Sequence, residues 1–474
     1  MGRRTEVLKL ARPVARLAVP VLIEQAGIVL MGTVNTMLAS NMGREAISAI
    51  GMIDSVSNIV ISVFGALAMG GTVAVAQHTG NEDREQASRA GAQALLSCML
   101  ISLATSLLIF AFQGPLIGGL FGGAEPLVLE NARAYLSVVL WSYLPIGFVG
   151  IAFGILRGSG DTRTPMAVSL LMNVFNVVFS FVLIYGIRLD LAGLSVRIPA
   201  LGVRGAAAGL ALARTLGAVL VLIPLFRTTA RLRMTDARHF RLDLVMQRCV
   251  FGIGIPASLE QLMFNGGKLI VQTFIVGLGT VAMAANAITS SAAGLLMIPG
   301  SALSTAAVTI VGQQVGRGDP KEARRRLVFV LATATGTMVL MSIAILPVAG
   351  GLLRFYTQDA ATLKAALPLL VSALIAQPLL WPVSFITPSG LRGAGDVRYT
   401  MTVSIVSMWL LRILLGYVFT VWLGWGILGI WLAMYADWAG RSLFFLKRMA
   451  GDRWLKGPVF AERAVRTTES DPDG

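Results

Sequence analysis

A seven-residue phrase occurs twice in this chain: residues 19–25 read V-P-V-L-I-E-Q, and residues 255–261 read I-P-A-S-L-E-Q. The two copies lie 236 positions apart in a chain of 474 residues. Each copy places a glutamate and a glutamine inside a strongly apolar run. Because a buried carboxylate is costly, its repetition indicates two copies of one structural unit.

The composition predicts an all-α membrane protein. Hydrophobic residues make up 55% of the chain, charged residues only 13%, and the mean hydropathy is +0.76. A soluble globular protein carries about a quarter charged residues. Many apolar runs exceed the roughly 20 residues that a helix needs to cross a bilayer. The net charge of +15 does not point to nucleic acid, because no basic surface is interleaved with aromatic residues.

Twelve membrane-spanning helices can be drawn from the apolar runs. They cover residues 14–40, 47–78, 90–113, 131–156, 162–187, 199–227, 249–276, 284–315, 326–350, 366–391, 399–422 and 426–447. A polar, arginine-rich stretch between the sixth and seventh spans divides the chain. We therefore predict an N-terminal lobe (1–227), a cytoplasmic linker (228–248), a C-terminal lobe (249–450) and a cytoplasmic tail (451–474).

The distribution of Lys and Arg predicts the orientation. The N-terminus, the loops after even-numbered spans and the C-terminus hold 29 of the 39 basic residues. The loops after odd-numbered spans and their flanks hold six: Arg44, Arg133, Arg188, Arg197, Arg354 and Lys364. By the positive-inside rule, we expect a multi-pass protein of the cytoplasmic (inner) membrane with both termini in the cytoplasm.

The repeat extends beyond the opening phrase. At the same offset of 236 the chain repeats Gln77 as Gln313 and Gly80 as Gly316. A second block, R-G-S-G-D-T-R at 157–163, returns as R-G-A-G-D-V-R at 392–398. Since each half has six spans, the halves share one orientation and are parallel repeats. Two such bundles predict two lobes and access that alternates by rocking.

Glu24 and Glu260 are the first candidates for chemistry, as ion-coupling residues. Burial raises the pKa of a carboxyl group, so either residue could exchange a proton near neutral pH. A structural role competes with this hypothesis. Pro20 and Pro256, one turn earlier, free backbone groups to which the repeated Glu-Gln pair could bond.

Further polar side chains could line a substrate cavity. In the first half, Asn35 lies 11 residues after Glu24 and therefore on the same helix face, while Asn176 and Ser180 share a face of the fifth span. The alternative is hydrogen bonding between helices, which is common for Asn and Ser in membranes. The full set of predicted cavity residues is Gln25, Asn35, Asn173, Asn176, Ser180, Gln261, Asn265, Lys268 and Arg412.

Several classes of site have no pattern in the sequence. Cys98 and Cys249 lack metal-type spacing and are expected to be buried thiols. No Walker A pattern occurs, so ATP-driven transport within this chain is not expected. We predict no catalytic residue, no metal site and no cofactor beyond H⁺ or Na⁺ as coupling ion, and therefore no enzyme.

Taken together, these features resemble those of the multidrug and toxic compound extrusion (MATE) transporters. The resemblance is carried by the twelve spans, the repeat, I-V-G-Q-Q-V-G-R-G-D-P-K-E-A-R at 310–324 and L-R-G-A-G-D at 391–396. It covers residues 14 to 450. The resemblance implies a V-shaped pair of lobes and a secondary antiporter that exports organic, often cationic, compounds in exchange for protons or sodium.

The chain departs from the family pattern at the family's ion site. The family has Asp within a phrase like V-D-T-M in the first span, where this chain has Asn35. One branch of the family also has Asp at the position of Ser180. Because Asn does not titrate near neutral pH, Glu24 becomes the candidate protonatable group of this lobe, with Glu260 as its counterpart.

Two alternatives accompany this hypothesis of a monomeric exporter of small organic compounds. The same fold could serve a flippase of a lipid-linked or anionic amphipathic substrate, whose head group would meet Lys268 and Arg412. A non-transporting scaffold or receptor is the alternative from a different class, but no sizeable soluble domain is present in the sequence to signal.

Overall fold

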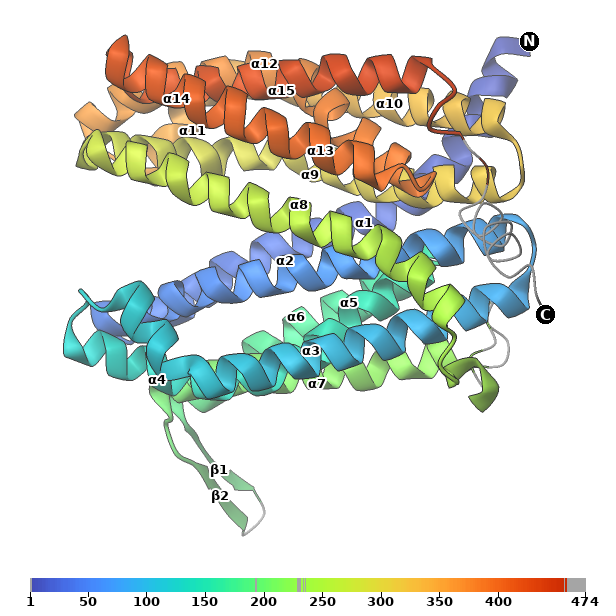
Figure 1. The fold of residues 1–474 in the computed structure, drawn as a ribbon. Helices are drawn as coiled ribbons and strands as arrows, with labels where there is room; N and C mark the ends of the chain where they lie inside the picture. The colour runs from blue at the N-terminus through green and yellow to red at the C-terminus, as the bar shows by residue number, and fades with distance from the viewer. Residues whose placement is uncertain are drawn as a thin grey trace. The chain divides into compact units, whose positions relative to one another are not determined.

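The computed structural model describes residues 2–191, 194–227, 232, 234, 236–455 and 457. Most of the predicted linker before residue 236 and most of the predicted tail after residue 455 lie outside the described residues. Within the described residues the chain is almost wholly helical (Figure 1).

All twelve predicted spans are helical, which confirms the predicted fold class. The first half contains α1 (Gly2–Ser40), α2 (Arg44–Gly80), α3 (Arg84–Phe121), α4 (Pro126–Val139), η1 (Leu140–Ser142), α5 (Tyr143–Gly158), α6 (Arg163–Tyr185) and α7 (Gly202–Phe226). A short helix, η2 (Ala237–Phe240), precedes the second half. The fourth predicted span is thus α4 and α5 joined through one 3-10 turn.

The second half repeats this pattern. It contains α8 (Leu244–Gly277), α9 (Thr280–Gly316), α10 (Pro320–Ile345), η3 (Leu346–Val348), α11 (Ala349–Tyr356), α12 (Ala360–Gly393), α13 (Val397–Ser407), η4 (Met408–Leu414), α14 (Leu415–Tyr417), η5 (Val418–Trp422) and α15 (Gly426–Ala450). Both η4 and η5 are π-helical. Such widened turns inside a helix are frequent at functional sites.

Ten helical segments among the described residues are long and apolar enough to cross a membrane. The two remaining helices of the twelve, α8 and α15, contain 34 and 25 residues. At 1.5 Å per residue both exceed the roughly 30 Å of a hydrocarbon core. These two helices also carry Glu260 and Asp437, and the cost of those charges needs a structural explanation.

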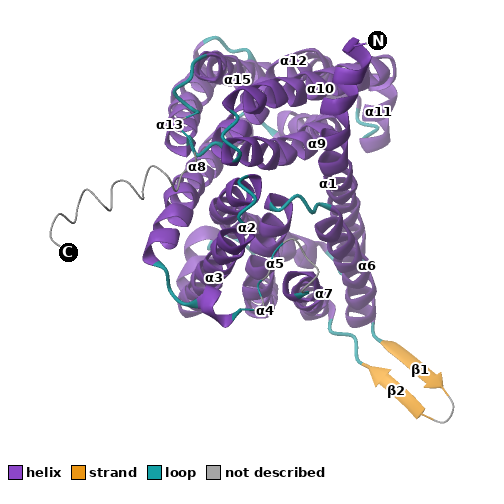
Figure 2. Cartoon of the chain, turned by 90° about the vertical axis from the view of Figure 1, so that its right-hand side faces the viewer, coloured by secondary structure: helices purple, strands orange, loops and turns teal. Residues whose placement is uncertain are grey.

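A β-hairpin lies where the sequence predicted only a loop between the fifth and sixth spans. Strand β1 (Ile187–Leu191) pairs antiparallel with β2 (Leu194–Ile198), with Ile187 opposite Ile198. The hairpin projects away from the helices that flank it, α6 and α7 (Figure 2). Apolar and polar residues alternate in both strands, which is the pattern of a hairpin; the loop prediction missed it.

The described chain divides into two compact units that are not consecutive stretches. One unit contains residues 23–75 and 84–254, and the other contains residues 1–22, 76–83 and 255–474. The first has a core of large side chains such as Phe64, Leu136 and Tyr143. The second has a larger core that includes Leu296, Leu327 and Phe445. The predicted lobe boundaries at 227 and 249 stay a prediction.

The repeated Gln and Gly residues contact one another directly inside the second unit. A Cβ atom on Gly80 would lie 2.0 Å from the carbonyl oxygen of Gln313, and one on Gly316 would lie 1.9 Å from that of Gln77. The two copies thus meet in the same way from both sides, and only glycine permits so close an approach. The side chain of Gln77 adds a hydrogen bond of 3.0 Å to the carbonyl oxygen of Gly393.

Candidate functional site

The two motifs that the sequence repeats are joined by an ion pair in the first half. Glu24 lies within α1, and Arg157 lies in the last turn of α5 at the start of the R-G-S-G-D-T-R block. Nη2 of Arg157 donates to both carboxylate oxygens of Glu24, at 2.5 and 2.7 Å. Glu24 is buried, with 3% of its surface exposed. Its charge is therefore compensated by a partner 133 residues away.

The second half makes the same ion pair. Glu260 of α8 accepts a hydrogen bond of 2.6 Å from Nη2 of Arg392, which begins the R-G-A-G-D-V-R block at the end of α12. Arg392 also donates through Nε to the hydroxyl of Thr400 at 3.3 Å. The other carboxylate oxygen of Glu260 has no hydrogen-bond partner among the described residues. The repeated phrase and the repeated block are thus one structural device, present twice.

Neither interpretation drawn from the sequence anticipated the arginine partners. The hydrogen bonds of Glu24 to described residues go to Arg157 and not to the backbone near Pro20. The signal was available, because both the glutamate and the arginine recur at nearly the same offset. Whether Glu24 and Glu260 exchange ions stays a prediction.

The polar side chains predicted for the first half form a chain between α1 and α6. The amide of Asn176 donates to Oδ1 of Asn35 at 3.3 Å, and the hydroxyl of Ser180 donates to Oδ1 of Asn176 at 3.0 Å. The structure therefore brings these three residues together through the interhelical bonding that was the alternative. Among the described residues no hydrogen bond or ion pair joins Glu24 to this chain.

The two remaining candidates of the first half are Asn173 and Gln25. Asn173 is half-buried. Its Nδ2 atom is buried without a hydrogen-bond partner among the described residues and lies close to Gly27 of α1. Gln25 is also half-buried. Their role in a substrate cavity stays a prediction.

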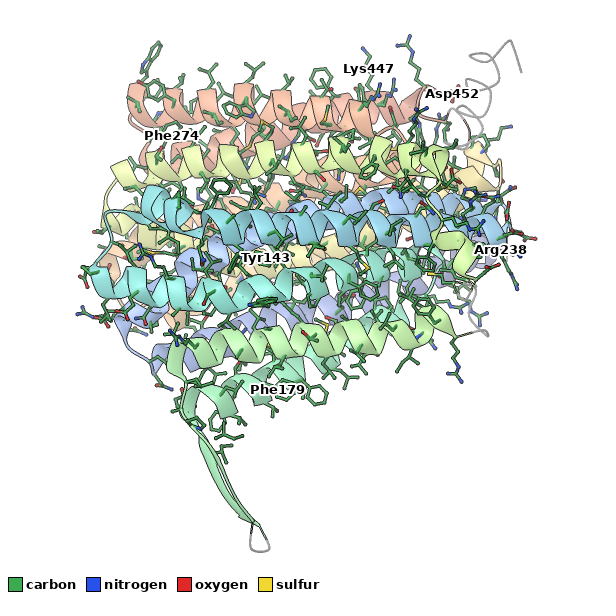
Figure 3. All side chains as sticks on the ribbon, turned by 60° about the horizontal axis from the view of Figure 1, so that its bottom comes forward. Tyr143, Phe179, Arg238, Phe274, Lys447 and Asp452 are labelled. Atoms are coloured by element: carbon green, nitrogen blue, oxygen red, sulfur yellow. The ribbon has the colours of Figure 1, made fainter. Side chains whose placement is uncertain are left out.

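A second polar network of the first half surrounds Asp54 of α2. The phenol of Tyr135 donates to Oδ1 of Asp54 at 3.3 Å, and the positive charge of Arg214 on α7 attracts that carboxylate. Next to them the hydroxyls of Tyr143 and Ser57 lie 2.8 Å apart. Tyr143 lies near the middle of the length of the helices (Figure 3).

The second half holds a denser group of charges around the ring of Phe264. Asp437 of α15 is fully buried and lies 3.2 Å from Nε of Arg441 and 3.7 Å from Nε of Arg412. Its Oδ1 atom also accepts a hydrogen bond of 2.6 Å from Ser407. The cationic groups of Lys268, Arg412 and Arg441 lie 4.9, 5.7 and 5.6 Å from the centre of the Phe264 ring.

Arg412 lies in the π-helical segment η4, and Lys268 lies on α8 two turns after Glu260. Gln261, Asn265 and Lys268 recur at helical spacing, so they follow one face of α8. Gln261 and Asn265 are half-buried, whereas Lys268 is exposed. The structure thus places Lys268 and Arg412 over the same ring, and the partner of Glu260 is Arg392. Their role as cavity residues stays a prediction.

The described residues contain no group of three His, Cys, Asp or Glu side chains that could hold a metal ion. Cys98 and Cys249 are both buried and form no disulfide with each other. The polar groups that the structure does bring together are buried ion pairs, an amide chain and a charged aromatic cluster.

Comparison with known proteins decides the family. The sequence model of the MatE family matches residues 20–182 and 256–418. The two matches are offset by 236 residues, the offset of the opening phrase. The chain belongs to the MatE family. It is therefore a MATE transporter built from two six-helix repeats, and the resemblance stated from the sequence is confirmed.

The relatives of this MATE protein cover nearly its whole length. It is 27% identical over 441 residues to the uncharacterized transporter YisQ of Bacillus subtilis, which covers 92% of this chain and 93% of the relative. It is 25% identical over 473 residues to the probable multidrug resistance protein NorM of Thermotoga maritima, covering 98% and 97% of the two chains.

Solved structures support the fold. A MOP superfamily transporter from Pyrococcus furiosus is similar with a TM-score of 0.82 at 20% identity, covering 94% of this chain and 98% of the other. An outward-facing multidrug resistance MATE family transporter gives a TM-score of 0.82 at 20% identity, covering 95% and 98%. At this identity the likeness concerns the fold alone.

Proposed function

We propose that this MATE protein is a secondary active antiporter that exports small organic compounds in exchange for protons. Family membership supports transport, and the relatives whose names refer to multidrug resistance support export of small molecules over the lipid-flipping alternative. The charge distribution of the loops supports an inner-membrane protein with both termini in the cytoplasm. We further propose that one chain suffices, since each half supplies one six-helix repeat.

The observation that carries the coupling is the ion pair of Glu24 and Arg157. A buried carboxylate held by one guanidinium can exist either paired or protonated, since a proton on Glu24 removes the charge that Arg157 neutralises. Proton entry would then release Arg157 from α1 and leave the start of the R-G-S-G-D-T-R loop free to move. The proton and Arg157 thus compete for the same carboxylate. Because each partner favours a different arrangement of the helices, this competition couples proton binding to the conformational equilibrium.

Protons are preferred to sodium because one carboxylate suffices for a proton, whereas Na⁺ requires several oxygens around one point. The amide chain of Asn35, Asn176 and Ser180 would contribute cavity polarity and hydrogen bonds to substrate without titrating. Asp54 is a second carboxylate in the same half. Unlike Glu24, it makes no ion pair within 4 Å among the described residues.

The test is efflux from proteoliposomes under an imposed pH gradient, with an imposed sodium gradient as the matched arm. We expect the pH gradient alone to drive transport, and Glu24→Gln to abolish the gradient dependence. Asp54→Asn and the exposed Glu125→Gln are the matched controls, because each also removes one negative charge. Both should keep the dependence of transport on the pH gradient. Full coupled transport by Glu24→Gln would rule out Glu24 as the coupling residue, and dependence on sodium alone would rule out proton antiport.

A further inference from the structure

The charge cluster around Phe264 holds more cations than carboxylates. We define the second-half cluster as the four cations and two carboxylates connected by the contacts described above: Lys268, Arg392, Arg412, Arg441, Glu260 and Asp437. Glu260 neutralises Arg392, and Asp437 must serve both Arg412 and Arg441. The cluster therefore carries two positive charges in excess within a membrane-spanning bundle.

Of the two buried arginines that share Asp437, Arg412 has its positive charge less well neutralised than Arg441. Only 7% of its surface is exposed, yet its nearest carboxylate oxygen is 3.7 Å away. Its hydrogen bond to described residues goes to the sulfur of Met408 at 3.9 Å, and it makes none to an oxygen among those residues. A guanidinium offers five donors in a fixed fork that suits a carboxylate or phosphate. Most of these donors make no hydrogen bond to the described residues.

Lys268 supplies a second cation, and it makes no ion pair with a carboxylate among the described residues. It lies 4.9 Å above the ring of Phe264, and the charge of Arg412 repels it. Its side chain is exposed in the structure. Ionisable side chains within membrane spans face the bundle interior or a water-filled cavity. Lys268 is therefore placed where a solute in such a cavity can reach it.

The aromatic ring does not replace a counter-ion. Three cations lie over the ring of Phe264, and of these Arg441 also lies 4.7 Å from the Phe385 ring and Arg412 also lies 5.9 Å from the Trp438 ring. A cation–π contact is weaker than an ion pair from which water is excluded. The first half provides the comparison within the same chain. There Glu24 pairs with Arg157 and Asp54 is accompanied by Arg214, so cations and carboxylates balance. These two pairs of the first half show no such excess among the described residues.

We propose that the second-half cluster is the binding site for an anionic group of the transported compound, a carboxylate, sulfonate or phosphate. Lys268 and Arg412 donate to that group, and Phe264 packs against the apolar part of the same molecule. This inference rests on the proposed export of small organic compounds and names their charge. It differs from the cationic substrates that the resemblance alone implies, since a cation at this site would meet like charges.

Direct binding to the purified full-length protein tests this assignment independently of coupling. The probes are two xanthene dyes of similar shape, the anion carboxyfluorescein and a cationic rhodamine ester, whose affinities are measured by fluorescence anisotropy. We expect the anion to bind roughly tenfold more tightly or better. Lys268→Gln should weaken anion binding by about tenfold, the loss expected for a hydrogen bond to a charged group, while Lys268→Arg retains it.

The controls separate this site from general positive charge. Lys447→Gln removes one exposed positive charge of α15 outside the cluster and should leave the affinity unchanged. Arg412→Gln should reproduce the loss; because Arg412 is buried, the exposed Lys268 remains the deciding position if that variant does not fold. Phosphatidylglycerol is then added to the detergent micelles that hold the wild-type protein. Competition with the dye identifies a lipid phosphate as a ligand of the site, and its absence identifies a soluble anion.

Two outcomes would overturn the proposal: tighter binding of the cationic dye, or unchanged anion binding in Lys268→Gln. The same dyes in proteoliposomes distinguish this failure from failure of the proposed function. Anion binding without transport driven by a pH gradient would refute proton antiport and leave the site intact. Gradient-driven export of the cationic dye alone, with no anion binding, would refute the site and leave the antiport intact.

Discussion

Removing one partner of the Glu24–Arg157 pair should destabilise the protein more than removing both. Arg157→Gln leaves the carboxylate of Glu24 uncompensated at 3% exposure. Such a loss costs about 3–5 kcal/mol for a fully buried pair. The Arg157 side chain is 19% exposed, and that partial hydration places the expected loss near the lower end, at about 3 kcal/mol.

The double variant tests the physical reason for that cost. Glu24→Gln combined with Arg157→Gln removes both charges and leaves two amides that can bond to each other. We expect it to lie within about 1 kcal/mol of the wild type, because a buried ion pair roughly balances its own desolvation. The assay is the free energy of unfolding of the purified protein, measured by titration with SDS in mixed micelles.

The second copy of the pair provides the matched comparison. Glu260 is also attracted by Arg441, so Arg392→Gln leaves it partly compensated and should cost only about 2 kcal/mol. The reasoning would be refuted if each single variant of Glu24 and Arg157 cost less than about 1 kcal/mol and the double variant were simply their sum. It would also be refuted if Arg392→Gln were the more damaging of the two arginine changes.

Three further predictions concern packing, pH and buried hydroxyls. Gly316→Val places its Cβ atom against the carbonyl oxygen of Gln77 and should lower the free energy of unfolding by about 2 kcal/mol or more, whereas Gly336→Val, with no atom within 4 Å, should not. The hydroxyl and backbone amide of Thr362 hold the pKa of Asp359 below its ordinary value of 3.8. The stability that Asp359 contributes is therefore present above that value and lost as the pH falls through the lowered pKa, so Asp359→Ala should melt below the wild type at neutral pH but alongside it in acid. Tyr143→Phe leaves the buried hydroxyl of Ser57 without its partner and should cost about 1 kcal/mol of unfolding free energy.

The spans and the repeat were predictable because both leave one-dimensional signals. Apolar runs of sufficient length have few alternatives to a helix in a membrane, so every predicted span is helical. The repeated residues align the two halves at an offset of 236 from the sequence alone, without any knowledge of contacts. The β-hairpin was missed because its short alternating pattern at 187–198 resembles the polar connections elsewhere, and a search for apolar runs passes over it.

The site was less predictable because its partners are distant in sequence. Sequence spacing relates Glu24 to Asn35 along one helix, but the partner of Glu24 is Arg157 on another helix. No helical period connects positions 133 residues apart. The nearly equal offsets of the glutamates and the arginines were the one usable signal, and it required reading the two motifs together.

Features that both halves share are best explained by the fold, and features of one half by function. The glutamate–arginine pair occurs in both halves with similar geometry, at 2.5 and 2.6 Å, and in both it ties the first helix of the repeat to a loop after an even-numbered span. A purely structural pair would make the two copies equivalent. The copies differ in their surroundings: both carboxylate oxygens of Glu24 accept from Arg157, whereas one oxygen of Glu260 accepts from Arg392 and the charge of Arg441 also attracts Glu260. Protonation of Glu24 therefore frees the guanidinium of Arg157, whereas protonation of Glu260 adds to an existing positive excess. We therefore expect the first copy to be the one at which a proton changes a contact at the smaller electrostatic cost.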